Sequence, residues 1–389
     1  MKAIICGAGI AGLAAANELV RIGWDIVMVE KAPARRHGGY MIDFFGPGYD
    51  AAEANGMLGA LSGRAYDIEG IELVNADGSR QSWTSYELFR KSVGGRVFSL
   101  LRGDIEDVLF EALPENIDLR FSTTIETVHS LDGGVDVTLS DGTRIKGDLL
   151  LGADGIHSHV RALLFGGGTD FVRDLGFRVV AYVFQSEQVR KAVADRFVMI
   201  SVPNRQVGIY NIREGGCTAF FVWRGAESLA DARQALAARF GDLGWVVPAT
   251  LAGVPDRSEI YADLTGQVIM PNWHKGRALL IGDAAFAVSL LAGQEASLAI
   301  GAAHALADAL DKNADPDAAL DAYEAMLRPE VEKKQAAGRR TAKWFVPSTP
   351  LQIWIRAVVM NLTTIPLLSR IVESFIATSP KGIFTPRQN

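Results

Sequence analysis

Three glycines near the amino terminus have the spacing of a phosphate-binding turn. The segment "GAGIAG" contains Gly7, Gly9 and Gly12 and directly follows the apolar run "KAIIC". In this motif the first glycine permits a tight turn, the second lets the backbone approach a pyrophosphate, and the third lets helix and strand pack closely. Unpaired N–H groups at the start of the helix can then bind phosphate oxygens.

The segments around these glycines are the elements that the motif requires. "LAAANELVRIG" has helical periodicity and stops at Gly23, and "DIVMVE" reads as a buried strand that ends at Glu30. A carboxylate at that position can accept hydrogen bonds from ribose hydroxyls. Strand, glycines, helix and acid together predict a site for an adenine dinucleotide, whereas a glycine-rich turn in an ordinary α/β protein would account for the glycines alone. The motif does not distinguish NAD from FAD.

The residues after the second strand argue against an NAD dehydrogenase. Such a protein would continue with alternating strands and helices for about 100 residues. Here Lys31 is followed by the basic, glycine-rich segment "APARRHGGYMIDFFGPG", which we expect to be a loop that leads to a helix. Arg35 and Arg36 could contact the adenosine or the pyrophosphate of a cofactor, or they could be solvated surface arginines.

Composition excludes several classes of function. The 389 residues are 49% hydrophobic and 22% charged, which allows a large core and two or three domains, and the net charge of −6 argues against a nucleic-acid partner. Two cysteines, Cys6 and Cys217, cannot form a disulfide framework, so we expect a reducing, cytoplasmic location. They also lack metal-ligand spacing, so we expect no metal. The first twenty residues have the composition of a signal peptide, but the glycine spacing favours the dinucleotide motif. No run has the roughly 18 apolar residues of a transmembrane helix.

Two further segments carry charges that need a partner. Arg102 begins the amphipathic segment "RGDIEDVLFEAL", where a cation opposes the helix dipole unless it serves a phosphate or a flavin edge. Asp283 follows the apolar run "ALLIG", and burying its carboxylate is costly unless it is hydrogen-bonded. Between them, residues 118–147 read as an antiparallel meander, followed by the buried strand "DLLLGADG" and a helix start with Ser158 and Arg161.

Taken in order, these segments resemble the flavoprotein aromatic hydroxylases of the para-hydroxybenzoate hydroxylase type. The resemblance rests on "GAGIAG" with Glu30, "LLRGDIEDVL" with Arg102, "GADGIHSHVR" with Asp154, and "LLIGDAA" with Asp283, which together span most of residues 1–310. Within that family the chain is most similar to tetracycline-inactivating and other polyketide-modifying monooxygenases. That narrower similarity rests on "GGYMIDFFGPG", on "AGQEASLAI" and on a long helical tail.

The resemblance implies an FAD-dependent monooxygenase. NADPH or NADH would bind transiently and reduce the flavin, which fits the lack of a second dinucleotide motif in the sequence. The reduced flavin would then react with O2 to give a C4a-hydroperoxide that hydroxylates an aromatic, phenolic or polyketide-like molecule. Because the flavin carries this chemistry, we expect no catalytic side chain. The expected partners are a small-molecule substrate and O2, and the expected state is a monomer or weak dimer.

The resemblance also implies roles for individual residues. Asp283 would hydrogen-bond the ribityl chain, Arg102 would reach the flavin, and Asp43 would lie near the isoalloxazine edge. The helix after "LAG" would point its N–H groups at the flavin N1–C2=O region. The predicted cofactor-binding set is Gly7, Gly9, Ile10, Ala11, Gly12, Glu30, Lys31, Arg35, Arg36, Asp43, Arg102, Asp154, Gly155, Gly282, Asp283, Gly293, Glu295, Ala296 and Ser297.

Three residues near Asp283 depart from the pattern of the family. Phe286, Leu290 and Glu295 stand where relatives usually have histidine, proline and glycine. Glu295 could point away from the flavin as an acid in the first helical turn, which is favourable for the helix dipole. If it points inward instead, its charge would disfavour the anionic reduced flavin and slow reduction.

The predicted fold is α/β: a Rossmann-like FAD-binding domain with an inserted antiparallel-sheet substrate domain and a C-terminal helical segment. We assign residues 1–70, 98–170 and 266–325 to the first domain, residues 71–97 and 171–265 to the second, and residues 326–389 to the helices. A hairpin at 70–86 and the strands "FRVVAYVF", "DRFVMISV", "QVGIYNIR" and "CTAFFVWRG" would form the sheet. Tyr210 and Arg213 are weak candidates for substrate contacts, and Arg213 could equally be a solvent-facing strand end.

Two questions stay open at this point. The tail could pack across both domains and gate the pocket, or it could contact lipid through Trp354, Ile355, Val358, Val359 and Met360, although it lacks the lysine-rich face of interfacial helices. The chain could also be a flavin-dependent reductase or dehydrogenase of a prenyl or other apolar substrate. A flavin-carrying protein that sequesters a ligand is a further alternative.

Overall fold

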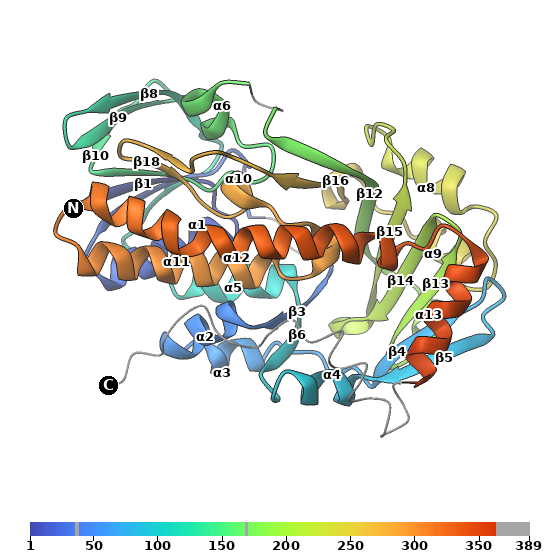
Figure 1. Cartoon of the computed structure of the whole chain (residues 1–389). Helices are drawn as coiled ribbons and strands as arrows, with labels where there is room; N and C mark the ends of the chain where they lie inside the picture. Colours follow the sequence, from blue (N-terminus) through green and yellow to red (C-terminus); the bar gives the residue numbers. More distant parts are fainter. Residues whose placement is uncertain (36–38, 168–169, 363–389) are drawn as a thin grey trace.

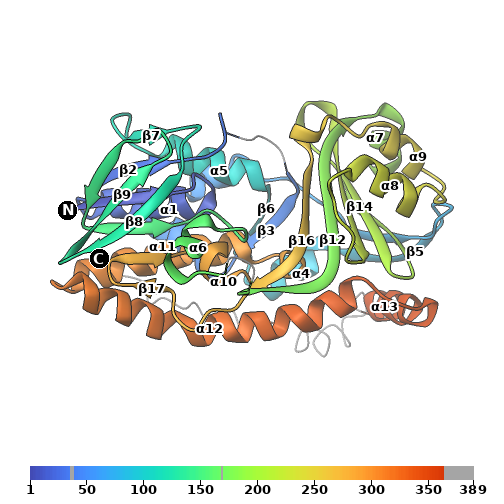
Figure 2. The same cartoon turned by 90° about the horizontal axis from the view of Figure 1, so that it is seen from above.

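Two large β-sheets, bridged by a long helix, divide the molecule into two halves (Figures 1 and 2). The computed structural model describes residues 1–35, 39–167 and 170–362. The amino-terminal half contains a six-stranded sheet in the order β17-β18-β11-β1-β2-β7, and the other half contains a seven-stranded sheet in the order β16-β12-β15-β14-β13-β4-β5.

The six-stranded sheet is parallel except at one edge. Its strands are β1 (Lys2–Cys6), β2 (Asp25–Val29), β7 (Asp118–Arg120), β11 (Leu149–Gly152), β18 (Ala278–Leu280) and the antiparallel β17 (His274–Lys275). The central strands are continuous apolar runs because both faces of the sheet are covered. The expected meander begins later than predicted, since Asp118–Arg120 pairs in parallel with β2 and extends this sheet.

Helices cover one face of this sheet and a small antiparallel sheet covers the other (Figure 1). The helices are α1 (Ile10–Arg21), α11 (Glu295–Lys312) and α5 (Arg102–Glu111), with α2 (Pro47–Ala54) and α3 (Leu58–Ser62) beside them. The opposite face carries the meander β8 (Ile125–Leu131), β9 (Gly134–Leu139) and β10 (Arg144–Gly147), together with α6 (His159–Phe165). The predicted turns of that meander are confirmed.

The glycine-rich segment after residue 38, for which the sequence predicts a loop, contains a strand. β3 (Met41–Phe45) pairs antiparallel with β6 (Val97–Leu101) before the chain enters α2. Ile42 and Phe44 are buried and alternate with less buried neighbours, which is the two-residue period of a strand. The alternation covers only five residues between glycines, which is too short to distinguish a strand from a loop by pattern alone.

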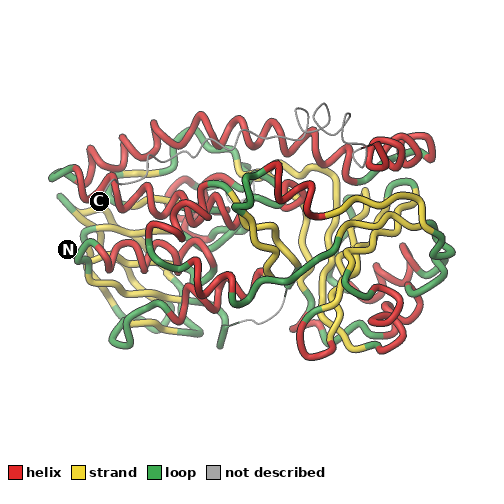
Figure 3. The backbone as a smooth tube through the Cα atoms, turned by 90° about the horizontal axis from the view of Figure 1, so that it is seen from below, coloured by secondary structure: helices red, strands yellow, loops and turns green. Residues whose placement is uncertain are grey.

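The seven-stranded sheet confirms the predicted hairpin and antiparallel strands. It consists of β4 (Gly70–Val74), β5 (Arg80–Ser85), β12 (Val172–Gln185), β13 (Arg196–Val202), β14 (Arg205–Asn211), β15 (Gly216–Arg224) and β16 (Tyr261–Val268). Only the β4–β13 pair is parallel. The helices α7 (Glu187–Val193), α8 (Ala232–Phe240) and α9 (Val247–Ala252) pack on one face, and α4 (Tyr86–Ser92) follows β5 (Figure 3).

The side chains of alternate residues in β12 point to opposite faces of this sheet. Tyr182 belongs to the core under the helices α7, α8 and α9. Val179 and Ala181 point to the opposite side, where Leu291 and Ala342 pack. The seven-stranded sheet therefore turns its second face toward the first half of the molecule and the long helix.

The long helix α12 (Pro316–Phe345) runs past both sheets, and α13 (Pro350–Leu362) follows it (Figure 2). α13 packs on β13 and β5 through Ile353, Arg356 and Ala357, whereas Trp354 is 62% exposed. Of the apolar face expected from Trp354 to Met360, Trp354 and Ile355 are exposed, whereas Met360 packs against the cluster of Leu73, Met199 and Ala357. No helix in the described ranges has the length and apolar character of a membrane span.

The fold class is confirmed as mixed α/β with C-terminal helices. The parallel sheet with its glycine turn lies in one half, and the inserted, largely antiparallel sheet lies in the other. The domain boundaries given above stay predictions.

Arg356 fastens α13 to the seven-stranded sheet. Its guanidinium is buried and donates to Gln206 Oε1 at 2.8 Å, to the Phe345 carbonyl at 2.9 Å and to Ser201 Oγ at 2.5 Å. Burial lowers the pKa of Arg356 to about 10. These bonds tie the end of α12, the middle of α13 and the strands β13 and β14 together.

We expect Arg356→Met to loosen α13. The substitution leaves buried acceptors without a donor, at a cost of roughly 2 kcal/mol. Limited proteolysis should then cut between α12 and α13 faster than in the wild type. Arg340→Met, at an exposed position on α12, is the control and should leave the rate unchanged. An unchanged rate in Arg356→Met would contradict the assigned role.

A buried ionic cluster joins the helices of the first half. Glu18 of α1 accepts from Asn55 Nδ2 at 2.5 Å and from Arg21 Nη2 at 2.9 Å, and it lies 2.8 Å from His304 Nδ1 of α11. Burial acts to raise the pKa of Glu18, but the contacts with His304, Asn55 and Arg21 outweigh burial and lower it below 4.5. The ionised carboxylate therefore stabilises the contact between α1, α2 and α11.

The lowered pKa of Glu18 predicts a loss of stability in acid. The stabilisation is complete above pH 4.5 and disappears as the pH falls through the lower pKa of the folded state. Chemical denaturation should show Glu18→Gln less stable than wild type by about 2 kcal/mol at neutral pH, and the difference should shrink below pH 4.5. A difference that is constant with pH, as expected for the exposed control Glu126→Gln, would show that Glu18 ionisation is not involved.

Candidate functional site

A cavity of about 350 Å³ lies at the carboxyl ends of β1, β2 and β11. In open parallel sheets this edge is where ligands bind, because loops and helix starts converge there. The residues of the predicted set that line the cavity are Gly7, Gly9, Ile10, Ala11, Glu30, Lys31, Arg35, Arg102, Asp154, Gly155, Asp283, Gly293, Glu295 and Ala296.

The glycine turn allows β1, β11 and α1 to approach one another closely. Gly7 has φ of +109°, and a Cβ there would lie 2.4 Å from the Ala153 carbonyl oxygen. A Cβ on Gly12 would lie 1.9 Å from the Gly7 carbonyl oxygen. α1 begins after Gly9 without a side-chain cap, so its first N–H groups are left for a ligand in the cavity.

Glu30 is anchored at the end of β2. Its carboxylate accepts from the Ala8 amide at 2.9 Å and from the Ala32 amide at 2.8 Å. These bonds hold the acid beside the glycine turn, where it still lines the cavity. Arg35 also lines the cavity, stacks 4.2 Å from the Phe110 ring centroid and pairs with Asp107. Arg36 lies outside the described residues.

Asp154 and Gly155 form the turn between β11 and α6. The Asp154 carboxylate accepts from the His159 and Val160 amides at 2.7 and 3.0 Å, so it is committed largely to the start of α6. Gly155 has φ of +81°, and its backbone lines the cavity. The fully buried Arg161 donates to the Ala284 carbonyl at 3.0 Å and thereby connects this turn to α10 (Asp283–Phe286).

Charged groups gather on the opposite wall of the cavity. Arg102, the first residue of α5, forms an ion pair with Glu106 at 2.9 Å. Burial raises the pKa of Asp283, with Arg102 acting against the shift and Asp263 adding to it. Asp283 has no hydrogen-bond partner within the part of the chain that the structure describes. Its carboxylate is therefore available to hydroxyl groups of a ligand.

Glu295, for which the sequence left two orientations open, is one of the residues that line the cavity. Its Oε1 accepts from the Ser289 amide at 3.0 Å. Burial raises its pKa well above 4.5, and the neighbouring Asp283 raises it further. The surroundings therefore disfavour the ionised form of the carboxyl group at the first residue of α11.

Several lining residues were not found from the sequence. Glu106 could have been found, because it lies one helical turn after Arg102 and is the natural partner of a cation there. Tyr40 and Tyr261 face each other with ring centroids 5.4 Å apart, and burial raises both pKa values. Tyr40 also packs 5.5 Å from Phe220 of the seven-stranded sheet. These aromatic contacts join positions some 200 residues apart, so no local pattern reveals them.

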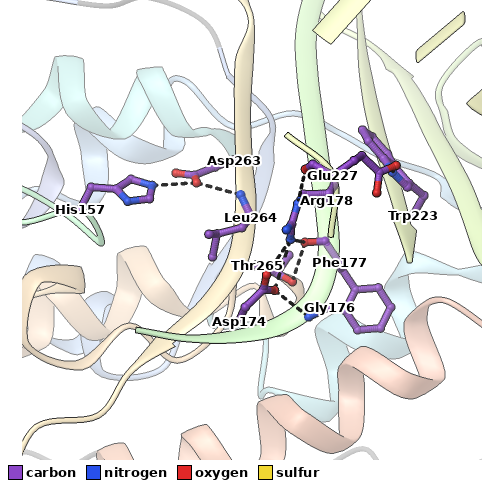
Figure 4. A network of polar contacts seen from close by, with 10 residues as sticks. All are labelled: His157, Asp174, Gly176, Phe177, Arg178, Trp223, Glu227, Asp263, Leu264 and Thr265. Atoms are coloured by element: carbon purple, nitrogen blue, oxygen red, sulfur yellow. Dashed lines mark hydrogen bonds and ion pairs between the residues drawn. The ribbon is translucent and has the colours of Figure 1, made fainter. Parts of the chain in front are cut away.

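His157 and Asp263 connect the two halves at the cavity edge. Figure 4 shows His157 reaching from the loop after β11 to Asp263 on β16, with Nε2 and Oδ1 2.9 Å apart. This contact raises the pKa of His157. The Asp263 carboxylate also accepts from the Leu264 amide, and Arg178 on the adjacent β12 contacts Asp174 and Glu227 (Figure 4).

Other predicted residues lie away from the cavity wall. Asp43 is bonded to Tyr86 Oη at 2.7 Å and Ser99 Oγ at 2.9 Å, and burial raises its pKa. Ser297 instead joins α11 to the Phe45 carbonyl and the Gly48 amide. Gly12 and Gly282 lie behind the cavity wall, where the lack of a side chain lets neighbouring segments pack closely. A Cβ on Gly282 would lie only 2.6 Å from the Cβ of Ala11.

The two weak substrate candidates also lie outside the cavity lining. Tyr210 Oη accepts from the Met41 amide and so connects β14 to β3. Arg213 is exposed in the turn after β14, where it lies over the Tyr66 ring at 4.3 Å and 3.4 Å from Asp104. The structure therefore puts Arg213 at a solvent-facing strand end.

The cavity has the groups that an adenine dinucleotide with a polyol linker needs. The start of α1 offers donors to a pyrophosphate, Glu30 can accept from a ribose, and Asp283 can accept from further hydroxyls. The aromatic rings of Tyr40 and Tyr261 offer flat apolar surface at the other end. These residues fit FAD.

Comparisons with known proteins agree with this geometry. A family model described as FAD binding domain matches residues 1–336. The "Flavin-dependent monooxygenase" of Legionella longbeachae is 30% identical over 351 residues, covering 87% of this chain and 88% of that protein. The uncharacterized protein Rv1260 of Mycobacterium tuberculosis is 32% identical over 334 residues, covering 80% and 85%. The crystal structure of the tetracycline destructase Tet(55) has a TM-score of 0.83 at 26% identity and covers 100% of this chain and 98% of that one. FAD is therefore the cofactor.

We expect Glu30→Gln to weaken FAD binding. The amide loses the negative charge that strengthens hydrogen bonds from ribose, an effect worth roughly tenfold to a hundredfold in affinity. Fluorescence titration of apoprotein with FAD would measure the dissociation constant. Glu126→Gln on the exposed strand β8 is the matched control, and equal affinities in the two variants would refute the role of Glu30.

Proposed function

This chain belongs to the family of flavin-dependent monooxygenases that share the FAD binding domain, and from that premise we propose its reaction. It uses NADPH or NADH and O2 to hydroxylate an aromatic, phenolic or polyketide-like small molecule, with tetracycline-like compounds among the candidates. The observation that carries the proposal is the meeting of the dinucleotide turn, the Arg102–Asp283 wall and the Tyr40–Tyr261 aromatic pair in one cavity.

Different residues bind different parts of FAD in this proposal. The N–H groups at the start of α1 hold the pyrophosphate, Glu30 holds a ribose, and Asp283 accepts from the ribityl chain. When bound, FAD supplies the electron transfer and the oxygen chemistry. The protein binds and orients the cofactor and substrate and keeps water out, so none of its side chains has to act as a nucleophile.

In this proposal NADPH or NADH binds only transiently, as the reductant of the flavin. The sequence contains one glycine fingerprint and one strand-terminal acid of the dinucleotide type, and FAD uses both. Residues 1–70, 98–170 and 266–325 form the FAD-binding domain. In this proposal residues 71–97 and 171–265 are the substrate domain, and residues 326–389, of which the structure describes 326–362, are the C-terminal segment.

The substrate class follows from the surfaces where the two halves meet. Tyr40 and Tyr261 line the cavity with their ring centroids 5.4 Å apart, Tyr40 packs on Phe220, and Leu290 adds apolar surface to the cavity. Such surfaces favour a flat, conjugated molecule by stacking and by removal of apolar area from water. The similarity to tetracycline destructases at 25% and 26% identity supports the same class.

The decisive assay measures NADPH or NADH oxidation and oxygen uptake together. With phenols and tetracyclines as candidate substrates, we expect stimulated oxygen uptake and a product heavier by one oxygen atom. Reduction of an apolar substrate without oxygen uptake would instead identify a reductase. Tight binding without turnover would identify a sequestering protein, and either result would overturn the proposed reaction.

A further inference from the structure

The strand β16 forms the edge of the seven-stranded sheet that lies toward the first half of the molecule (Figure 2). Its carboxyl end is fastened there by buried hydrogen bonds. The side-chain amide of the fully buried Gln267 donates to the Val288 and Gln335 carbonyls, both at 2.7 Å. This end of the strand is therefore fixed to the segment before α11 and to α12.

The amino end of β16 meets the first half through side chains. Tyr261 and Asp263 are two residues apart on this strand, so their side chains point to the same face, and both line the FAD cavity. Tyr261 packs on Tyr40 with ring centroids 5.4 Å apart. Asp263 Oδ1 lies 2.9 Å from His157 Nε2, which comes from the loop after β11 (Figure 4). The His157–Asp263 contact therefore spans the two halves of the molecule beside the aromatic pair.

The His157 ring is open to solvent, whereas its partner is mostly covered. The side chain of His157 is 57% exposed and that of Asp263 is 21% exposed. The titratable and charged groups around the ring are Asp263 of β16, Lys31 after β2, Asp154 of its own turn, and His159 and Arg161 of α6. The hydrogen bond to Asp263 outweighs burial and the repulsion from Lys31 and Arg161, and it raises the pKa of His157 above 6.5.

We propose that His157 and Asp263 are positioning residues that form a pH-sensitive latch between the two halves of the molecule. With His157 protonated, the charged pair holds the amino end of β16, and the Tyr261 ring with it, against the FAD cavity. With His157 neutral, the hydrogen bond loses its charge and this end of the strand is held less firmly. The buried bonds of Gln267 keep the carboxyl end in place in both states.

The direction of the pH effect follows from the raised pKa of His157. The stabilisation is complete below pH 6.5 and is lost as the pH rises through the higher pKa of the folded protein. An ion pair with this exposure changes the ratio of latched to unlatched protein by roughly two- to fivefold. The proposal rests on FAD occupying the cavity and is independent of the substrate that is hydroxylated.

Hydrogen–deuterium exchange of the FAD-loaded protein tests the latch. The measured rates are corrected for the chemical exchange rate at each pH between 5.5 and 9. Over this range we expect exchange at residues 261–264 of the wild type to become faster by roughly two- to fivefold. Exchange at Gln267 and Val268, at the fixed end of the same strand, should stay constant and serves as an internal control.

Three variants separate the charge of His157 from its presence. His157→Arg carries a positive charge throughout this range, so exchange at residues 261–264 should stay slow. His157→Asn is neutral throughout, so exchange should be fast at every pH. The control is His274→Asn, because the His274–Asp321 contact of 3.2 Å lies outside the cavity lining, and it should behave as wild type. A wild type without the pH effect, or a pH effect that persists in His157→Asn, would overturn the proposal.

Asp263→Asn tests the same contact from its other side, in case the His157 variants do not fold. The substitution keeps the size of the side chain and removes its charge. At pH 5.5 we expect this variant to exchange at residues 261–264 as fast as the wild type does at pH 9. Slow exchange in Asp263→Asn would overturn the latch. Failure of the wild type to bind FAD would instead contradict the FAD site, and failure to hydroxylate any candidate would contradict only the proposed reaction.

Discussion

The close backbone contact among β1, β11 and α1 is the constraint on which the site depends. A Cβ on Gly12 would lie 1.9 Å from the Gly7 carbonyl oxygen, and one on Gly7 would lie 2.4 Å from the Ala153 carbonyl oxygen. Because side chains are absent at both positions, α1 starts directly at the end of the sheet. Its unpaired N–H groups then face the cavity, and the Ala8 amide comes within 2.9 Å of Glu30.

The long helix α12 fixes the other side of the cavity. Gln335 donates to the Val268 carbonyl at 2.8 Å and to the Ala287 carbonyl at 3.1 Å, and Gln267 donates to the Val288 carbonyl at 2.7 Å. These bonds connect β16 of one sheet to the segment that leads into α11. α12 is therefore part of the support of the site, which explains why it runs past both halves (Figure 2).

Sequence patterns predicted the parts of the molecule that are determined by residues close together along the chain. The glycine turn, the position of Glu30 after β2 and the hairpins follow from spacing along a short segment, and the structure has them where the sequence predicts them. The aromatic pair Tyr40–Tyr261 was missed because the two residues meet only when the two sheets come together. The role of Asp154 was also hidden, since its bonds to the start of α6 depend on how the turn after β11 closes.

The fold also determines how charge is distributed in the cavity. Arg102 comes from α5, Asp283 from α10 and Glu295 from α11, so three separate elements bring their charges to one wall. Arg102 already pairs with Glu106 at 2.9 Å. A single cation cannot balance all of these acids in a site with little water, because the cost of an unbalanced charge rises as the effective dielectric constant falls.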